Sequence, residues 1–298
     1  MSASASLPTD RTVLLYAGPG AWDVSVEETQ NMLSRYFDTH SIKRAYDLSN
    51  LNEKTALLVI PGGSLLEIHD TLARDAKKIS DYIQNGGRYL GICAGAIYMS
   101  ECMIGKPAYI PPSASEEIRS LFKQNLLTFK FKPYMKICSL GLYPGPCIAP
   151  HIVKTIDRES PLNFCAAQVH LPSLEEAPFN LYTYSGPVFQ KTPPGTKVLL
   201  HFADPLEYQV IEENCKMTND IIAEKSPAAC ISYMQKKGKI VLSGVHPEIN
   251  PSTFAATALK YQFRAILPEE IKESESARIK LLDTLFKELD FHPISTSE

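Results

Sequence analysis

RYLGICAGAIYMS, residues Arg88–Ser100, changes from an apolar run into a helix-like pattern, with a cysteine at the junction. Within it, GICAG (91–95) has the form Gly-x-nucleophile-x-Gly. The tight turn of that pattern strains the backbone of the nucleophile, so the residues two positions either side must lack bulk. We therefore interpret Cys93 as a nucleophile at a strand-to-helix turn, and not as a buried structural cysteine.

Working outward, the first hundred residues alternate strand-like and helix-like patterns. Ser25 and Glu28 have the spacing of a capping box at the first helix. Alternating strands and helices predict a parallel sheet whose ligands bind beyond the carboxyl ends of its strands. Cys93 and the glycines at 18–20 and 62–63 should share that edge. The predicted strands are Thr12–Tyr16, Ile42–Asp47, Thr55–Ile60 and Arg88–Ile92.

The chain changes character after about residue 105, where short strand-like runs separated by turn residues predominate up to about residue 235. A predicted hairpin and two helices follow, the last over about Ser276–Leu289. We predict an α/β fold with a mostly parallel sheet flanked by helices, flavodoxin-like and glutamine-amidotransferase-like. Residues 1–10 should form a flexible tail, and 11–298 a single domain with its strand-rich elaboration at about 105–235.

The segment LSGVHPEIN (Leu242–Asn250) supplies the base that a thiol nucleophile needs. His246 follows the last strong strand, and Pro247 favours an extended backbone before it. Residues two apart then point the same way, so Glu248 can accept the Nδ1 proton of His246. We predict a triad of Cys93, His246 and Glu248.

An acyl-transfer site also needs N–H donors for the developing oxyanion. The Ala94 N–H, directly after the nucleophile, is one candidate. PGG (61–63) follows a neighbouring strand, and there Gly63 is the preferred donor, with Gly62 next. We expect the loops at 17–24, 64–70 and 184–189 to line the pocket, with Trp22 facing it.

Composition excludes several other classes of function. The 298 residues are 44% hydrophobic and carry a net charge of −3, so we expect neither a nucleic-acid nor a membrane partner. Seven cysteines without a C-x-x-C pair argue against disulfides and a zinc cluster. The N-terminus lacks the apolar core of a signal peptide. We expect a cytoplasmic protein that uses no metal and no cofactor.

The segments PGG (61–63), GICAG (91–95) and HPE (246–248) together resemble the class I glutamine-amidotransferase-like superfamily. That superfamily has a glycine-rich oxyanion strand, a G-x-C-x-G elbow and a late H-x-E. Within it the chain looks most like the N-terminal domain of eukaryotic-type biotin-protein ligases, a domain also found free-standing. The resemblance rests on LLYAGPG, ALLVIPGGS, GGRYLGICAGAIY, YPGP, YTYSGPVF and GKIVLSGVHPE. It implies that Cys93, His246 and Glu248 are nucleophile, base and orienting group. The sequence contains no glycine/arginine-rich biotinyl-adenylate loop, so we do not expect it to biotinylate a substrate itself.

Three interpretations of function stay open. The first is a cysteine-dependent amide or acyl hydrolase acting on glutamine, a γ-glutamyl compound or a peptide, with a separate synthetase or ligase as a possible partner. The second is a non-catalytic regulatory module that binds a metabolite or a partner protein on the same fold. The third is a redox or electrophile sensor at Cys93.

Overall fold

The computed structural model describes residues 11–104, 140–149, 152–153, 164–172, 177–184, 186–189, 192–203, 206–207, 209–211, 217–221, 226–260 and 273–294. The predicted tail at 1–10 and the first part of the elaboration, 105–139, lie outside this range. The helices are α1 (Asp23–Leu33), α2 (Leu65–Leu72), α3 (Ala76–Gln84), α4 (Ala94–Met99), α6 (Pro251–Lys260) and α8 (Glu275–Glu288). The strands that position the site are β1 (Thr12–Tyr16), β2 (Ile42–Ala45), β3 (Thr55–Ile60), β4 (Arg88–Ile92), β15 (Ala228–Gln235) and β16 (Gly238–Ser243).

A mixed sheet forms the centre of the molecule. Its strands β2, β1, β3, β4 and β16 lie side by side in that order, and each is parallel to its neighbours. β15 then pairs antiparallel with β16, as the predicted hairpin requires. The predicted fold class, a mostly parallel sheet flanked by helices, is confirmed.

The strand-rich region extends this sheet from β15. Its described strands include β9 (Phe179–Tyr184), which pairs antiparallel with β8 (Phe164–His170), and β11 (Lys197–Phe202), which pairs with both β8 and β15. β15 also pairs with a second group of strands. In that group β10 (Val188–Phe189) lies next to β15, β6 (Tyr143–Ala149) lies next to β10, and β5 (Ser100–Ile104) lies next to β6. Outside the sheet lie β7 (Ile152–Val153), β12 (Leu206–Glu207), β13 (Gln209–Ile211) and β14 (Met217–Ile221).

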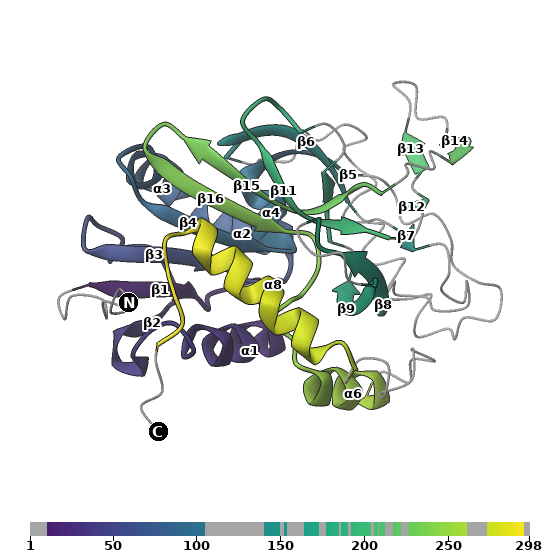
Figure 1. Ribbon diagram of the computed structural model, residues 1–298. Helices are drawn as coiled ribbons and strands as arrows, with labels where there is room; N and C mark the ends of the chain where they lie inside the picture. The colour runs from purple at the N-terminus through teal and green to yellow at the C-terminus, as the bar shows by residue number, and fades with distance from the viewer. Residues whose placement is uncertain are drawn as a thin grey trace.

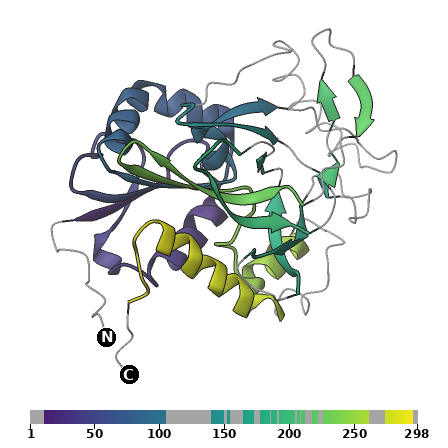
Figure 2. The same ribbon diagram turned by 45° about the horizontal axis from the view of Figure 1, so that its top comes forward.

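Alternate residues of each buried strand enter two separate cores. In β1, Val13 and Leu15 pack on one face of the sheet, and Leu14 and Tyr16 pack on the other. The first core also contains residues of α1 and α8, and the second contains residues of α2, α3 and α4. The sheet is therefore enclosed between two helical layers, as Figures 1 and 2 show.

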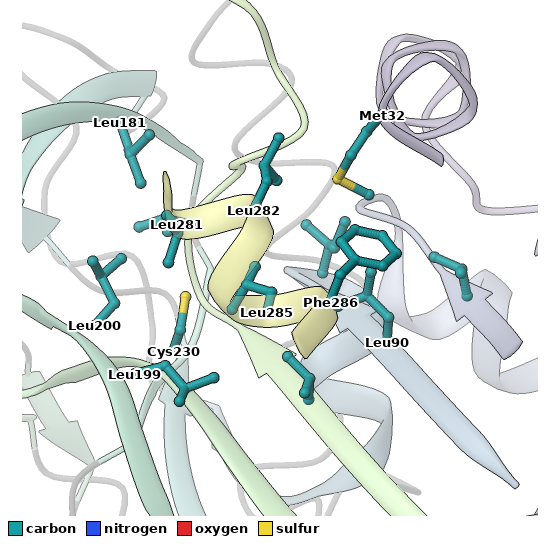
Figure 3. Close-up of a cluster of buried hydrophobic side chains, with 14 of the residues drawn as sticks. Met32, Leu90, Leu181, Leu199, Leu200, Cys230, Leu281, Leu282, Leu285 and Phe286 are labelled. Atoms are coloured by element: carbon teal, nitrogen blue, oxygen red, sulfur yellow. The ribbon is translucent and has the colours of Figure 1, made fainter. Parts of the chain in front are cut away.

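The last helix, α8, seals the first core. Figure 3 shows Leu282, Leu285 and Phe286 projecting from it toward the sheet and toward Met32 of α1. Phe286 is fully buried and stacks on Tyr36, with ring centroids 3.8 Å apart. The apolar stripe predicted for this segment therefore packs as expected, and it joins the end of the chain to the first helix.

The main difference from the sequence prediction concerns residues 64–70. They were expected to form a loop, but Leu65–Leu72 form α2, which packs against α4 through the second core. Apolar Ile68 and Leu72 are fully buried and stabilise this helix, a tertiary contact that local pattern does not reveal. In the part of the chain that the structure describes, no helix has both the length and the apolar character needed to cross a membrane.

Candidate active site

The predicted nucleophile, Cys93, stands between β4 and α4, with its side chain 5% exposed. Its backbone has φ 51° and ψ −108°, a region that residues other than glycine rarely adopt. The Cys93 N–H donates to the Ser243 carbonyl at 2.8 Å, so the end of β16 holds the turn in place. Such a conformation persists only where the surroundings enforce it, as at a nucleophile elbow.

The glycines on either side of Cys93 let α4 approach the sheet closely. A Cβ at Gly95 would lie 2.0 Å from the Ile60 carbonyl oxygen, and one at Gly91 would lie 2.6 Å from the Gly95 carbonyl oxygen. Both separations are far below van der Waals contact, so the backbone would have to move to admit a side chain. The turn itself therefore requires the small residues that the sequence places there.

His246 lies in the loop after β16, and the strand-rich region holds its backbone. The His246 N–H donates to the Tyr182 carbonyl, on β9, at 2.8 Å. Its Nδ1 lies 2.8 Å from Glu248 Oε1, and His246 and Glu248 are each 1% exposed. Because an ionised carboxylate only accepts hydrogen bonds, this contact assigns a proton to Nδ1. Nε2 is then the ring nitrogen that can exchange a proton with another group.

The pKa of His246 links its imidazole to Cys93 as well as to Glu248. Burial lowers this pKa, but the Glu248 carboxylate and the charge and hydrogen bond of Cys93 together raise it to about 10. Within the described residues, Nε2 makes no hydrogen bond of ordinary geometry. Cys93 and Glu248 thus both act on the same imidazole, and together they favour its protonated form.

Gly62 lies against this imidazole, but its N–H is already engaged. A Cβ at Gly62 would lie 2.5 Å from His246 Cε1, so only glycine leaves room for the ring. The Gly62 N–H donates to Ser25 Oγ at 3.0 Å. That partner conflicts with the oxyanion role predicted for Gly62, and it could not be foreseen because Ser25 belongs to a distant part of the chain.

Gly63 and Ala94 present further N–H groups at the same edge of the sheet. A Cβ at Gly63 would lie 1.9 Å from the Gly20 carbonyl oxygen, so the loops after β1 and β3 touch there. Ala94 begins α4 directly after Cys93. No hydrogen bond among the described residues engages either N–H. Their role as oxyanion donors stays a prediction that this geometry accommodates.

Ser25 and Glu28 do not form the capping box that their spacing predicts. α1 starts at Asp23 with Trp22 as its N-cap, so both residues lie inside the helix, where they are buried. Ser25 Oγ donates to Glu248 Oε1 at 2.7 Å. The two residues are 223 positions apart, so no local pattern indicates this contact.

Two helices hold the loop that carries His246 and Glu248. From α1, Glu28 accepts hydrogen bonds from Asn250 Nδ2 at 2.6 Å and from Thr253 Oγ1 at 2.8 Å. From α8, the Arg278 guanidinium donates to the Pro247 carbonyl at 2.7 Å. The positions of the His246 and Glu248 side chains in this loop therefore depend on helices at the two ends of the chain.

Aromatic side chains border the imidazole. The Trp22 ring lies edge-on to His246 with centroids 5.8 Å apart, and the Tyr182 ring lies 5.3 Å away. Trp22 is half-buried and stacks on Tyr182. The expectation that Trp22 lies beside the site agrees with these contacts, whereas Tyr182 was not foreseen, because its place depends on how the strand-rich region folds back. In the described portion of the chain, no group of three or more His, Cys, Asp or Glu side chains could hold a metal ion.

The protein has a glutamine-amidotransferase-like fold. A solved structure described as a glutamine amidotransferase matches with a TM-score of 0.50, covering 84% of this chain and 98% of its own. The two sequences are 15% identical, so this likeness shows the fold alone.

The particular family follows from sequence. A profile of the family described as "Biotin-protein ligase, N terminal" matches residues 11–105 and 139–298. The chain therefore belongs to the biotin-protein ligase N-terminal family, which confirms the resemblance. It is 27% identical over 287 residues to the biotin-protein ligase of Schizosaccharomyces pombe, covering 92% of this chain and 37% of that protein. It is also 28% identical over 200 residues to an uncharacterized protein of Chlamydia muridarum, covering 67% of this chain and 62% of that protein. The chain thus spans less than two thirds of either relative.

Proposed function

We propose that the protein is a cysteine-dependent amide or acyl hydrolase with Cys93 as nucleophile, His246 as proton carrier and Glu248 as orienting group. The observation that carries the proposal is one buried imidazole whose Nδ1 lies 2.8 Å from Glu248 Oε1 and whose pKa Glu248 and Cys93 together raise to about 10. An imidazolium beside the sulfur favours the thiolate, the reactive form of cysteine. The strained backbone of Cys93 supports the same assignment.

The reaction proceeds in two halves. The Cys93 thiolate attacks the amide carbon, and the N–H groups of Gly63 and Ala94 hold the oxyanion. His246 gives its proton to the leaving nitrogen as the C–N bond breaks, which releases ammonia or an amine and leaves a thioester on Cys93. His246 then takes a proton from water as the oxygen of that water attacks the thioester. The C–S bond breaks, a carboxylic acid leaves, and the thiolate–imidazolium pair is restored.

The proposed substrates are glutamine, a γ-glutamyl compound or a peptide, by analogy with the fold. Ammonia released here could serve a separate synthetase or ligase. In this proposal the acyl group lies near the half-buried Trp22, whose ring is edge-on to His246, and near the N–H of Gly63. The surrounding loop glycines allow backbone donors, and not long side chains, to approach the reacting carbonyl.

A chloroketone analogue of glutamine tests this proposal. It should form one adduct on Cys93, located by peptide mass spectrometry, and glutamine should protect against it. Cys93→Ser should abolish the adduct, whereas Cys147→Ser, which removes a buried cysteine outside the site, should leave the labelling rate unchanged. Labelling of other cysteines with Cys93 untouched in the folded protein would contradict the proposal.

The burial of the triad gives weight to a second candidate, a regulatory module that binds a metabolite or partner without turnover. Cys93 is 5% exposed, and His246 and Glu248 are 1% exposed, so a substrate reaches the sulfur only if neighbouring side chains move. A module would bind a ligand without releasing acid, ammonia or amine. Calorimetric binding of glutamine without adduct formation or product release would favour this alternative.

A further inference from the structure

The Ser25 hydroxyl lies between two groups of the site. Ser25 is fully buried on α1, donates to Glu248 Oε1 at 2.7 Å and accepts the Gly62 N–H at 3.0 Å. Glu248 Oε1 also accepts a hydrogen bond from His246 Nδ1, with the two atoms 2.8 Å apart. One chain of hydrogen bonds thus leads toward Cys93. It runs from the Gly62 N–H through the Ser25 hydroxyl and the Glu248 carboxylate to the His246 imidazole.

We propose that Ser25 is a positioning residue that fixes the orientation of Glu248 and, through it, the orientation of the His246 imidazole. This inference rests on the proposed function and adds a fourth residue to it. Both hydrogen bonds that Glu248 accepts meet at Oε1, and no described residue makes a hydrogen bond to Oε2. Without the Ser25 hydroxyl, the hydrogen bond with His246 is the one that remains on the carboxylate among the described residues.

The position of Ser25 in its helix supports a specific role for the hydroxyl. Serine inside a helix usually bonds back to a carbonyl one turn earlier or points to solvent. Ser25 does neither and reaches the loop after β16, 223 residues away. Groups that orient a histidine from beyond its immediate contacts commonly change activity by about 10- to 100-fold when removed.

Other groups around this pair could also affect its protonation. Cys93 faces His246 from the turn after β4, and Tyr182 faces it from β9. Cys230, on β15, is close enough for Glu248 to raise its pKa, and Arg278 of α8 holds the adjacent Pro247 carbonyl. None of these groups changes in a Ser25 variant, so a difference from wild type reports the hydroxyl.

The test is the rate at which iodoacetamide alkylates Cys93, measured by peptide mass spectrometry across pH. Ser25→Ala should slow alkylation at neutral pH by about tenfold, the least that loss of a hydrogen bond to a charged group predicts. The pH profile of the rate should change as well, because the misoriented carboxylate supports the His246 imidazolium less well. Ser25→Thr keeps the hydroxyl and should retain most of the rate.

Two comparisons separate positioning from general damage to α1. Thr29 is fully buried on the same helix, and its hydroxyl has no partner among the described residues, so Thr29→Val should leave both rate and profile unchanged. In a Glu248→Ala background, Ser25→Ala should have no further effect, because the hydroxyl acts through the carboxylate. Thermal unfolding verifies that each variant is folded.

The outcomes distinguish this inference from the proposed function. A folded Ser25→Ala protein with the wild-type rate and profile would overturn the inference alone. The inference would also be overturned if Ser25→Ala lowered the alkylation rate as much in the Glu248→Ala background as in wild type. That result would show that the hydroxyl acts by another route, such as Gly62. If wild-type Cys93 is alkylated no faster at neutral pH than Cys93 in a folded His246→Ala protein, the proposed function fails, and the role of Ser25 in it fails as well.

Discussion

Replacing Gly62 with alanine should displace the imidazole without straining the backbone. Gly62 is not among the glycines with positive φ, so alanine can adopt its conformation. The added Cβ would lie 2.5 Å from His246 Cε1, whereas carbon atoms in contact are separated by about 3.5 Å or more. The ring must therefore move by about 1 Å, away from Cys93 or Glu248 or both. A misplacement of about 1 Å at a catalytic group can cost about 100-fold in rate.

The assay is the rate of adduct formation at Cys93 with the chloroketone, measured alongside thermal unfolding. Gly62→Ala should fold and react about 100-fold more slowly than wild type. Gly86→Ala is the matched control, because Gly86 has φ 109° and lies before β4, at the end opposite Cys93. It should lose about 1 kcal/mol or more of stability to backbone strain and keep the wild-type rate. A folded Gly62→Ala protein that reacts as fast as wild type would refute the packing argument.

Three further predictions concern the framework and the other cysteines. Arg278→Met leaves the Pro247 carbonyl without its donor and should lower the free energy of unfolding by about 2 kcal/mol; an unchanged denaturation midpoint would contradict this. Phe286→Ala removes a fully buried ring from the core of Figure 3 and should cost about 3–5 kcal/mol by the same measurement; a loss below about 1 kcal/mol would show that α8 packs loosely. Burial raises the pKa of the Cys230 thiol to about 12, so iodoacetamide should not alkylate Cys230 in the native protein near neutral pH. Alkylation of Cys230 as fast as that of Cys93 would contradict this prediction.

The sequence was most informative where a local pattern determines the structure. Apolar runs bounded by glycine predicted β1, β3 and β4 with their observed ends. GICAG predicted the turn at Cys93 because its small residues are a steric requirement of that turn. The H-P-E spacing likewise predicted that His246 and Glu248 point the same way, as their 2.8 Å contact shows.

Contacts between distant segments could not be predicted in this way. Ser25 has the spacing of a helix cap, yet its hydroxyl serves a carboxylate from the other end of the chain. Tyr182 reaches His246 only because β9 folds back beside the loop after β16. Gly62 was assigned as an oxyanion donor because nothing in PGG shows that its N–H already has a partner. Such pairings follow from tertiary packing, which a single sequence does not encode locally.

The dependence of Cys93 alkylation on His246 tests the central claim most directly. The pKa of His246 is raised to about 10, so its imidazolium persists through neutral pH and is lost only as the pH rises toward that value. A neighbouring imidazolium makes a cysteine more reactive, so wild-type Cys93 should be alkylated near pH 7 about tenfold or more faster than Cys93 in a folded His246→Ala protein. Equal alkylation rates in the two folded proteins would contradict the account.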